Sequence, residues 1–472
     1  MTDLPTGWVA VTLAELGAAG EQTVLTGPFG SNLGREDFVS SGVPVLTIGC
    51  LGAGGISKSK LLHVSASTAK QLENYRLRAG DFLFSRMASV GRAGIVPDDL
   101  DGALFNYHLM RLRLDDGAIS PRLLFYYVRG SLIVREYLDA VSHGATRDGI
   151  NTKLLLNMPV WVPPVPEQRR IVTKIDSLCT KSKRARDQLD HVSRLAEKYK
   201  QTILSAAFRG DLTRQWRQGH GPDSQWLSRR LEDLIDEGPS NGWSPKSGPD
   251  ATGALALKLT ATTSGYMRLD AAAVKRIHET PPSTSPYWLK PGDLLVRRSN
   301  TIEYVGAAAI FEGPSDTYIY PDLMMRIRIK DEIDCRYIWR YLNSEPARQY
   351  FRERATGTAG NMPKINGDTL RSLPVQLPAT ADERREVVRR IETAFGWIGR
   401  IAAQTTNARE LIDHLDRAVL GKAFQGELVP QDPSDEAASV LLERIRAERA
   451  AMPTMHGGNG KERSSGRRQR RG

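Results

Sequence analysis

Ten residues in the middle of the chain, ILSAAFRGDL at 203–212, occur a second time as VLGKAFQGEL at 419–428, an offset of 216 residues. The same offset places EQRR at 167–170 on ERRE at 383–386 without a gap. Further upstream, LRAGDFLFSR at 77–86 matches LKPGDLLVRR at 289–298. Self-similarity of this kind indicates one unit of roughly 215 residues used twice. We expect each unit to contain a globular part followed by a helical part of fixed length.

The helical part of each unit carries apolar residues in alternating steps of four and three. A heptad spacing sustained over a whole segment predicts a coiled coil. The residues that we expect in the coiled coil or at a partner surface are Ile171, Ile175, Leu178, Leu189, Val192, Ile203, Val387, Ile391, Ile398, Ile412, Leu415 and Val419. The same spacing also runs through Ser182, Tyr199, Ile401 and Thr405.

Prolines and glycines bound both helical parts. The first follows PPVP at 163–166 and stops at Gly210, and the second follows Pro378 and stops at Gly426. About 40 residues at 1.5 Å each make a rod of roughly 60 Å. A generic helical hairpin is the plainer interpretation, but the matched lengths favour a spacer.

The globular parts, about 1–165 and 221–379, are predicted to be mixed α/β. Short apolar runs between glycine-rich turns predict strands at 43–48, 81–84, 109–114, 293–296 and 324–329. Helices are predicted at 121–141 and 336–354.

The composition favours a polyanionic partner. The 472 residues carry a formal net charge of +11, and residues 166–220 hold 13 Lys and Arg against 6 Asp and Glu. The three cysteines are far apart, and neither a signal peptide nor a long apolar run is present, so we expect a protein of the reducing cytoplasm. The tail ends GGNGKERSSGRRQRRG, which we expect to be disordered. It is either a phosphate-binding arm or a solvated end.

Several catalytic motifs are missing from the sequence. It contains no Asp-x-Lys or Glu-x-Lys triplet, P-loop, HExxH, GxSxG, or Asn/Asp-Pro-Pro-aromatic motif, and the eight histidines show no metal-ligand spacing. We therefore expect no catalytic site, metal or cofactor in this chain.

Loops rich in Gly, Ser, Asn and Arg recur at equivalent places in both units, at 27–32, 85–92, 144–149, 297–301 and 357–364. Arg and Asn side chains can pair with guanine and adenine edges. The residues that we expect to contact DNA are Ser31, Asn32, Arg86, Arg92, Arg147, Arg297, Arg298, Asn300, Asn361 and Lys364. For any single loop, an ordinary solvated turn is an equal alternative.

These features resemble the DNA-specificity subunits of type I restriction-modification enzymes. The resemblance covers about residues 4–430 and rests on GDFLFSR and GDLLVRR, on the helix start at 164 onward, and on the paired AAFRGDL and KAFQGEL ends. The second helix starts ADERR without the glutamine, and the arginine-rich tail belongs to no part of the pattern.

The resemblance implies two target recognition domains, at 1–163 and 221–378. Helices at 164–220 (with a linker) and 379–428 would pair as an antiparallel coiled coil with pseudo-two-fold symmetry, and 429–472 would be a tail. It also implies double-stranded DNA with a gapped, two-part site as the target. Two methyltransferase subunits using S-adenosylmethionine, and restriction motor-nuclease subunits using ATP and Mg, would be the partners.

The residues alone leave other functions open. A coiled-coil adaptor that binds only proteins is the main alternative, and a self-contained nuclease-methyltransferase is disfavoured by the missing motifs. The sequence does not identify the bases that are read.

Overall fold

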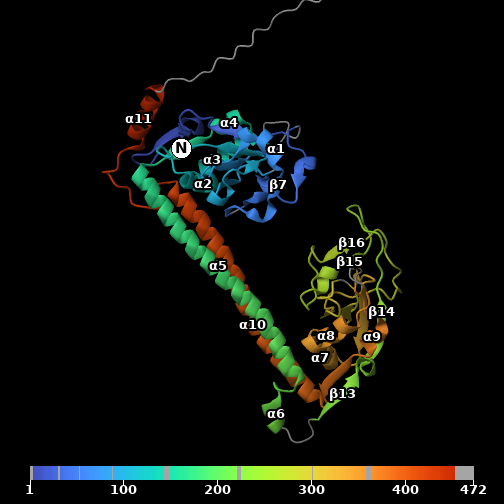
Figure 1. Cartoon of the computed structure of the whole chain (residues 1–472). Coiled ribbons are helices and arrows are strands. Elements are labelled where there is room, and N and C mark those ends of the chain that lie inside the picture. The colour runs from blue at the N-terminus through green and yellow to red at the C-terminus, as the bar shows by residue number, and fades with distance from the viewer. Residues whose placement is uncertain are drawn as a thin grey trace, which may run out of the picture. The chain divides into compact units, whose positions relative to one another are not determined.

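The computed structural model describes residues 4–29, 32–52, 54–87, 89–142, 149–219, 225–299, 301–357 and 363–451. The chain divides into two units, the first made of residues 1–187 and 409–472 and the second of 188–408. Two long helices, α5 (Val165–Phe208) and α10 (Ala381–Ala423), contribute residues to both units (Figure 1).

The first unit is built around an antiparallel sheet in the order β2-β11-β8-β9. Strand β8 reads FLFS, and all of its side chains are buried because both faces of this central strand are covered. A second sheet has the order β10-β4-β7-β3, and β1 pairs with β12 and β5 with β6. The strands are β1 Val9–Thr12, β2 Val24–Thr26, β3 Phe38–Val39, β4 Val43–Leu46, β5 Leu51–Gly52, β6 Gly55–Ile56, β7 Leu62–Val64, β8 Phe82–Ser85, β9 Ala93–Ile95, β10 Leu104–Phe105, β11 Leu109–Leu112 and β12 Pro159–Val162. The helices are α1 Ala66–Gln71, α2 Pro121–Gly130, α3 Leu132–Ser142, α4 Thr152–Leu156 and α11 Ala438–Ala451.

The second unit has a corresponding antiparallel sheet in the order β14-β20-β17-β18, a smaller sheet β16-β15-β19, and the pair β13-β21. Its strands are β13 Trp226–Arg230, β14 Ile235–Asn241, β15 Leu255–Leu257, β16 Val274–Arg276, β17 Leu294–Arg297, β18 Ala308–Ile310, β19 Tyr318–Ile319, β20 Met324–Ile329 and β21 Pro374–Pro378. Its helices are α6 Arg214–Gly219, α7 Glu332–Leu342, α8 Glu345–Arg354 and α9 Gly367–Arg371.

The two units repeat the same topology. The strands of the two central sheets correspond in order, and each unit adds one parallel pair, β10-β4 in the first and β19-β15 in the second. The mixed α/β class and the internal repeat expected from the sequence are thereby confirmed.

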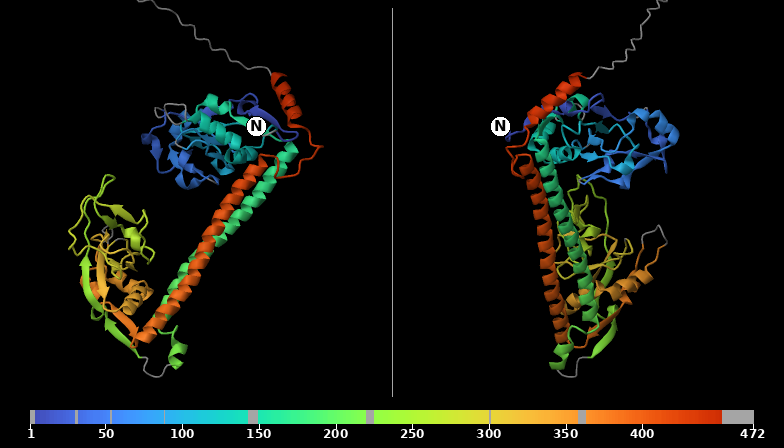
Figure 2. Two further views of the ribbon diagram at one scale, coloured as in Figure 1. Left: turned by 180° about the vertical axis from the view of Figure 1, so that it is seen from behind. Right: turned by 60° about the vertical axis from the view of Figure 1, so that its left-hand side comes forward.

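Each unit uses the start of one long helix and the end of the other. In the first, Ile171 and Ile175 of α5 join a core with Val419 of α10. Ser182 donates to Asp416 at 2.6 Å, and Arg186 pairs with Asp413 at 2.6 Å. Because the partner number falls along α10 as the number rises along α5, the two helices are antiparallel, and they lie side by side in both views of Figure 2. In the second unit, one buried core contains Leu204, Ala207 and Phe208 of α5 together with Val387 and Ile391 of α10.

Two predicted helices are each broken into two. The helix expected at 121–141 is α2 followed by α3, because Gly130 is a poor helix former and Ser131 is extended. The helix expected at 336–354 is α7 followed by α8. Asp331 caps α7 by accepting hydrogen bonds from the amides of Ile333 and Asp334, and α8 restarts with a proline in its first turn.

Part of the C-terminal tail is ordered as α11. Ala438, Leu442 and Ile445 are buried in the core of the first unit, and Arg449 donates to the carbonyl of Glu15 at 3.0 Å. Because α11 lies outside the repeated unit, the repeat pattern carries no signal for it, and the sequence did not predict it. The arginine-rich end at 457–472 lies outside the described residues. Within the described ranges, no helix is long and apolar enough to cross a membrane.

Candidate nucleic-acid interface

Arg86 and Arg298 occupy equivalent positions at the end of the central strand of each unit. The Arg86 amide donates to the carbonyl of His108 at 3.0 Å, and the Arg86 carbonyl accepts from the Ile150 amide at 2.9 Å. In the second unit, the Arg298 amide donates to Leu323 at 3.0 Å, and its carbonyl accepts from Ile365 at 2.8 Å. The same backbone connections therefore bring the same loops to both strand ends.

In the first unit, Arg86 lies in a group of aromatic side chains. Its guanidinium is 5.8 Å from the ring centre of Phe29, which is 57% exposed and stacks on Tyr107 at 6.2 Å. The rings of His108 and Tyr107 are tilted by 35° with their centres 3.9 Å apart, and burial together with the Arg86 charge lowers the pKa of His108. A neutral imidazole, an exposed ring and a cation side by side can contact both base edges and phosphates.

Two further predicted residues lie near this group on the same unit. Asn32 is exposed, and its amide donates to the Phe29 carbonyl at 2.8 Å. Arg92 is also exposed, and its amide is held by the Ser85 hydroxyl at 2.8 Å. Phe29 and Tyr107 are not among the contact residues expected from the sequence. An aromatic residue inside the glycine-rich loop at 27–32 was the available signal for Phe29.

In the second unit, the structure brings Arg298 and Lys364 together. Ser299, the residue after Arg298, forms a β-bridge with Lys364, and Lys364 also bridges to Thr356. Arg298 is half-buried and Lys364 is exposed. The predicted residues Ser31, Arg147, Asn300 and Asn361 lie outside the described residues.

Arg297 does not fit the expected role of a base contact. Its side chain is 2% exposed, its Nη2 donates to the Leu259 carbonyl at 2.5 Å, and its guanidinium is 5.1 Å from the ring centre of Tyr304. The reason is its position as the last residue of the buried strand β17, which directs this side chain inward and leaves Arg298 at the strand end.

Leu415 is the one member of the expected coiled-coil set that is exposed, at 54%. The inward place is taken by Asp416, which pairs with Ser182 and with Arg186 at 2.6 Å. The apolar spacing predicts Leu415 because a pattern of apolar residues does not include an aspartate, although Asp416 makes the contact. Tyr199 and Ile401, which follow the same apolar spacing, are also exposed, at 60% and 47%.

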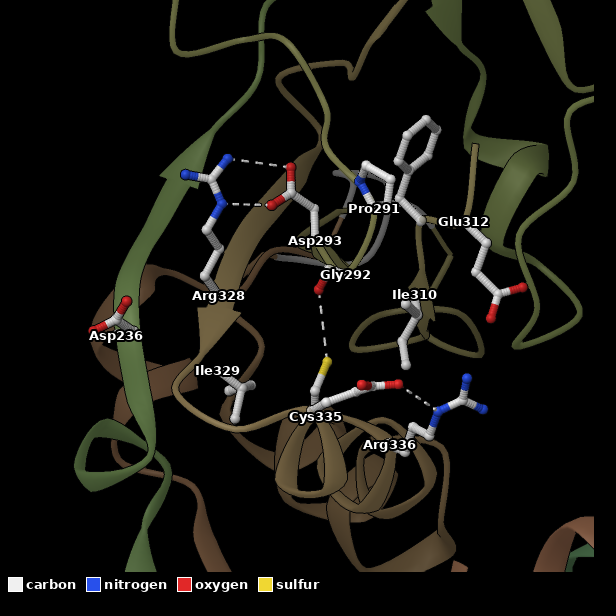
Figure 3. A pocket seen from close by; sticks show the side chains of 12 residues that line it. Asp236, Pro291, Gly292, Asp293, Ile310, Glu312, Arg328, Ile329, Cys335 and Arg336 are labelled. Atoms are coloured by element: carbon white, nitrogen blue, oxygen red, sulfur yellow. Dashed lines mark hydrogen bonds and ion pairs between the residues drawn. The ribbon is translucent and has the colours of Figure 1, made fainter. Parts of the chain in front are cut away.

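A hollow of about 580 Å³ in the second unit lies away from these loops, beside β17, β18, β20 and α7 (Figure 3). Arg328 pairs with Asp293 at 2.6 Å on one wall, and the Cys335 thiol donates to the Gly292 carbonyl at 3.6 Å. Burial raises the pKa of Cys335 to about 12, so that its thiol stays protonated at neutral pH and is no nucleophile. Among the described residues, no group of three or more His, Cys, Asp or Glu side chains is placed to hold a metal ion.

Comparison with known proteins gives related sequences and a related fold. The family described as "Type I restriction modification DNA specificity domain" matches residues 5–190. The type I restriction enzyme EcoKI specificity subunit of Escherichia coli (strain K12) is 28% identical over 352 residues, which are 71% of this chain and 74% of that protein. The StySPI specificity subunit of Salmonella potsdam is 28% identical over 344 residues, 70% of this chain and 72% of that one.

One solved chain, from work on complex assembly and conformational transition of the type I R-M system, has a TM-score of 0.63 at 20% identity. The match covers 90% of this chain and 100% of that chain. At this identity the likeness concerns the fold.

Proposed function

Because the chain belongs to the DNA-specificity subunits of type I restriction-modification enzymes, we propose that each of its globular domains reads one half of a gapped DNA site. Its role is to give the enzyme DNA sequence specificity. The observation that carries the proposal is the doubled strand-end site, in which Arg86 and Arg298 have the same backbone partners in the two units.

The proposal assigns residues 1–163 and 221–378 to target recognition. The long helices, within 164–220 and 379–428, act as the spacer, and 429–472 form a tail of which α11 is part. Among the expected DNA contacts, Asn32, Arg92 and Lys364 are exposed and Arg86 and Arg298 are half-buried, which supports their assignment to this role.

The proposed partners are those of the family. Two methyltransferase subunits would supply S-adenosylmethionine-dependent adenine methylation, and restriction motor-nuclease subunits would supply ATP- and Mg-dependent cleavage. The chain itself would direct these reactions in the cytoplasm without a catalytic site of its own. The alternative of an adaptor that binds only proteins is not favoured, since the relatives are specificity subunits.

The test uses the chain assembled with its methyltransferase subunit. Methylome mapping first identifies the site, and binding is then measured for cognate and scrambled duplexes over a salt series with Arg86→Ala and Arg298→Ala. Each variant should relax a different half of the site, at about 1–3 kcal/mol if the arginine pairs with guanine. Loss of a phosphate contact would instead weaken binding to all duplexes alike and lower the slope of log K against log salt concentration by about one. Arg400→Ala, on the exposed surface of α10, is the control.

A second experiment tests the spacer. Inserting four residues after Val192 lengthens α5 by about 6 Å and adds about one turn. Methylome mapping should show an altered gap or lost activity. An unchanged site with full activity would contradict the proposed spacer.

A further inference from the structure

A hollow of about 470 Å³ in the second unit lies where its globular part meets the long helices. Its walls come from α5, from the turn at 263–266, from the loop at 303–307, from α7 and α8, and from Phe395 of α10. This is a different hollow from the one in Figure 3, and it adjoins the loop that follows the strand-end residue Arg298.

Arginines of α7 and α8 line this hollow, and Arg297 of β17 lies against Tyr304 in its wall. Arg340, 6% exposed, is 3.7 Å from the ring centre of Trp339 and 5.0 Å from those of Tyr266 and Phe395. Its Nη1 donates to the Tyr266 hydroxyl at 3.0 Å, and its Nε makes no hydrogen bond within the described part of the chain. Arg340 is therefore buried and held in one orientation, with donor capacity left over.

Arg348 and Arg297 add charge at the same place. Arg348 lines the hollow and donates through Nη2 to the Glu303 carbonyl. Burial, together with the neighbouring charges of Arg352 and Arg297, lowers the pKa of Arg348 to about 10. Arg297 stacks on Tyr304 in the wall, and its Nε and Nη1 have no hydrogen-bond partner among the described residues.

The carboxylates that line the hollow compensate these charges only in part, since the charge of Glu345 favours the protonated form of Arg348 without an ion pair between them. Arg352 pairs with Glu345, and Lys200 pairs with Glu197 at 2.7 Å. The Glu303 carboxylate is engaged by the Thr301 hydroxyl, which lowers its pKa. Across the described residues, no carboxylate forms an ion pair with Arg297, Arg340 or Arg348. Buried cations without a counter-charge are costly, and a bound anion would remove that cost.

The first unit has a hollow of about 510 Å³ at the corresponding place. Leu420 in its wall corresponds to Leu204 in the second unit at the offset of 216 residues, and Gly91 corresponds to Gly306. The amides of these glycines donate to the equivalent carbonyls of Ser85 and Arg297. This hollow is also lined by arginines, namely Arg129, Arg135 and Arg417.

We propose that the hollow of the second unit binds a phosphate group, held by the guanidinium groups of Arg340 and Arg348 with Arg297 behind them. Guanidinium forks match phosphate oxygens geometrically, and the volume leaves room for an attached sugar. The phosphate belongs either to the DNA backbone or to a free phosphate or nucleotide. The DNA source rests on the proposed function, and the free source does not.

The experiment uses the full chain with its methyltransferase subunit and compares Arg348→Gln with Arg354→Gln. Arg354 is on the same helix, is exposed, and stacks on Tyr350 outside the hollow, so that the control removes the same charge. Inorganic phosphate and pyrophosphate are titrated at constant ionic strength by calorimetry. Duplex binding is measured over a salt series in parallel.

Saturable phosphate binding that Arg348→Gln weakens tenfold or more, with DNA binding unchanged, identifies a free phosphate. If Arg348→Gln lowers the slope of log K against log salt concentration by about one, for cognate and scrambled duplexes alike, the bound phosphate belongs to the DNA backbone. If wild-type protein binds no phosphate and Arg348→Gln leaves the slope unchanged, the inference is wrong, even where sequence-specific DNA binding persists. Arg348→Lys keeps the charge but removes the guanidinium group, and it covers the case in which the glutamine variant does not fold. It should lose part of the phosphate affinity or of the salt slope. Full retention of both would overturn the inference.

Discussion

Replacing Glu167 and Glu383 by glutamine should change stability in opposite directions, although the repeat makes these positions equivalent. Both carboxylates are buried in the first turn of a long helix. Both also accept a hydrogen bond from a tryptophan indole, Trp8 at 3.0 Å and Trp226 at 3.3 Å. The difference lies in their other partners.

Glu383 accepts from the Thr213 hydroxyl and from Arg217 Nη1, each at 2.7 Å. Each carboxylate has one oxygen without a hydrogen bond among the described residues, Oε1 of Glu167 and Oε2 of Glu383. Arg170, which lies near Glu167, pairs with Asp435 at 2.6 Å. Burial, the largest cause, raises the pKa of Glu167. The difference is therefore the ion pair: Glu383 pairs with Arg217 at 2.7 Å, whereas Arg170 acts on Glu167 only through its charge.

The expected magnitudes follow from these contacts. Glu383→Gln replaces a charge-assisted pair with Arg217 and should cost about 2–3 kcal/mol. Glu167→Gln keeps an acceptor for the indole and removes a buried charge, so that it should gain about 0.5–1 kcal/mol.

The gain at Glu167 should depend on pH. Since the folded-state pKa is raised, the ionised carboxylate penalises folding at pH values above that pKa. Below the unfolded-state pKa of about 4.3 the carboxyl is neutral in both states, and the advantage of glutamine disappears.

The assay is hydrogen exchange of the full chain, followed in peptides around each tryptophan at neutral pH and near pH 4. Glu410→Gln, at an exposed position of α10, is the control and should leave both regions unchanged. Equal destabilisation by Glu167→Gln and Glu383→Gln, or a gain at Glu167 that grows towards acid, would refute the reasoning.

Other contacts in the first unit allow matched tests by urea denaturation of the full chain. Phe424→Ala removes a buried ring that meets Tyr127 edge-on at 5.0 Å and should cost about 3–5 kcal/mol; a loss below about 1 kcal/mol would contradict this packing. Gly130→Ala would put a Cβ 2.3 Å from the Cβ of Leu420 and should cost about 1–3 kcal/mol. Gly421→Ala, with nothing within 4 Å of its Cβ, should instead gain about 0.5–1 kcal/mol, and equal effects at the two glycines would sink this argument.

The large-scale organisation could be predicted because the internal repeat and the regular spacing of apolar residues are both present in the sequence. The offset of 216 residues predicts the repeat, and the proline and glycine limits place the helix ends near those of α5 and α10. The apolar runs at 81–84 and 293–296 coincide with β8 and β17 to within a residue. Local pattern suffices here because backbone hydrogen bonding and apolar burial act over short stretches of chain.

The candidate site was only partly predictable. Arg86 and Arg298 were found from matching loops, and the structure gives them the same backbone partners. The adjacent Arg297 was expected at the same surface but is buried, since a single step along a strand reverses the direction of the side chain. Phe29 and Tyr107 become one aromatic group only when loops far apart in the sequence meet.

The sequence by itself determined the repeat, the two long helices and the order of the elements, since each follows from residue type and spacing along the chain. Only the tertiary structure decided which side chains face inward, as with Asp416 in place of Leu415, and which charges have partners, as with Glu383 in contrast to Glu167. The physical reason is that burial and electrostatic compensation depend on groups brought together in space, whose distances the linear order does not contain.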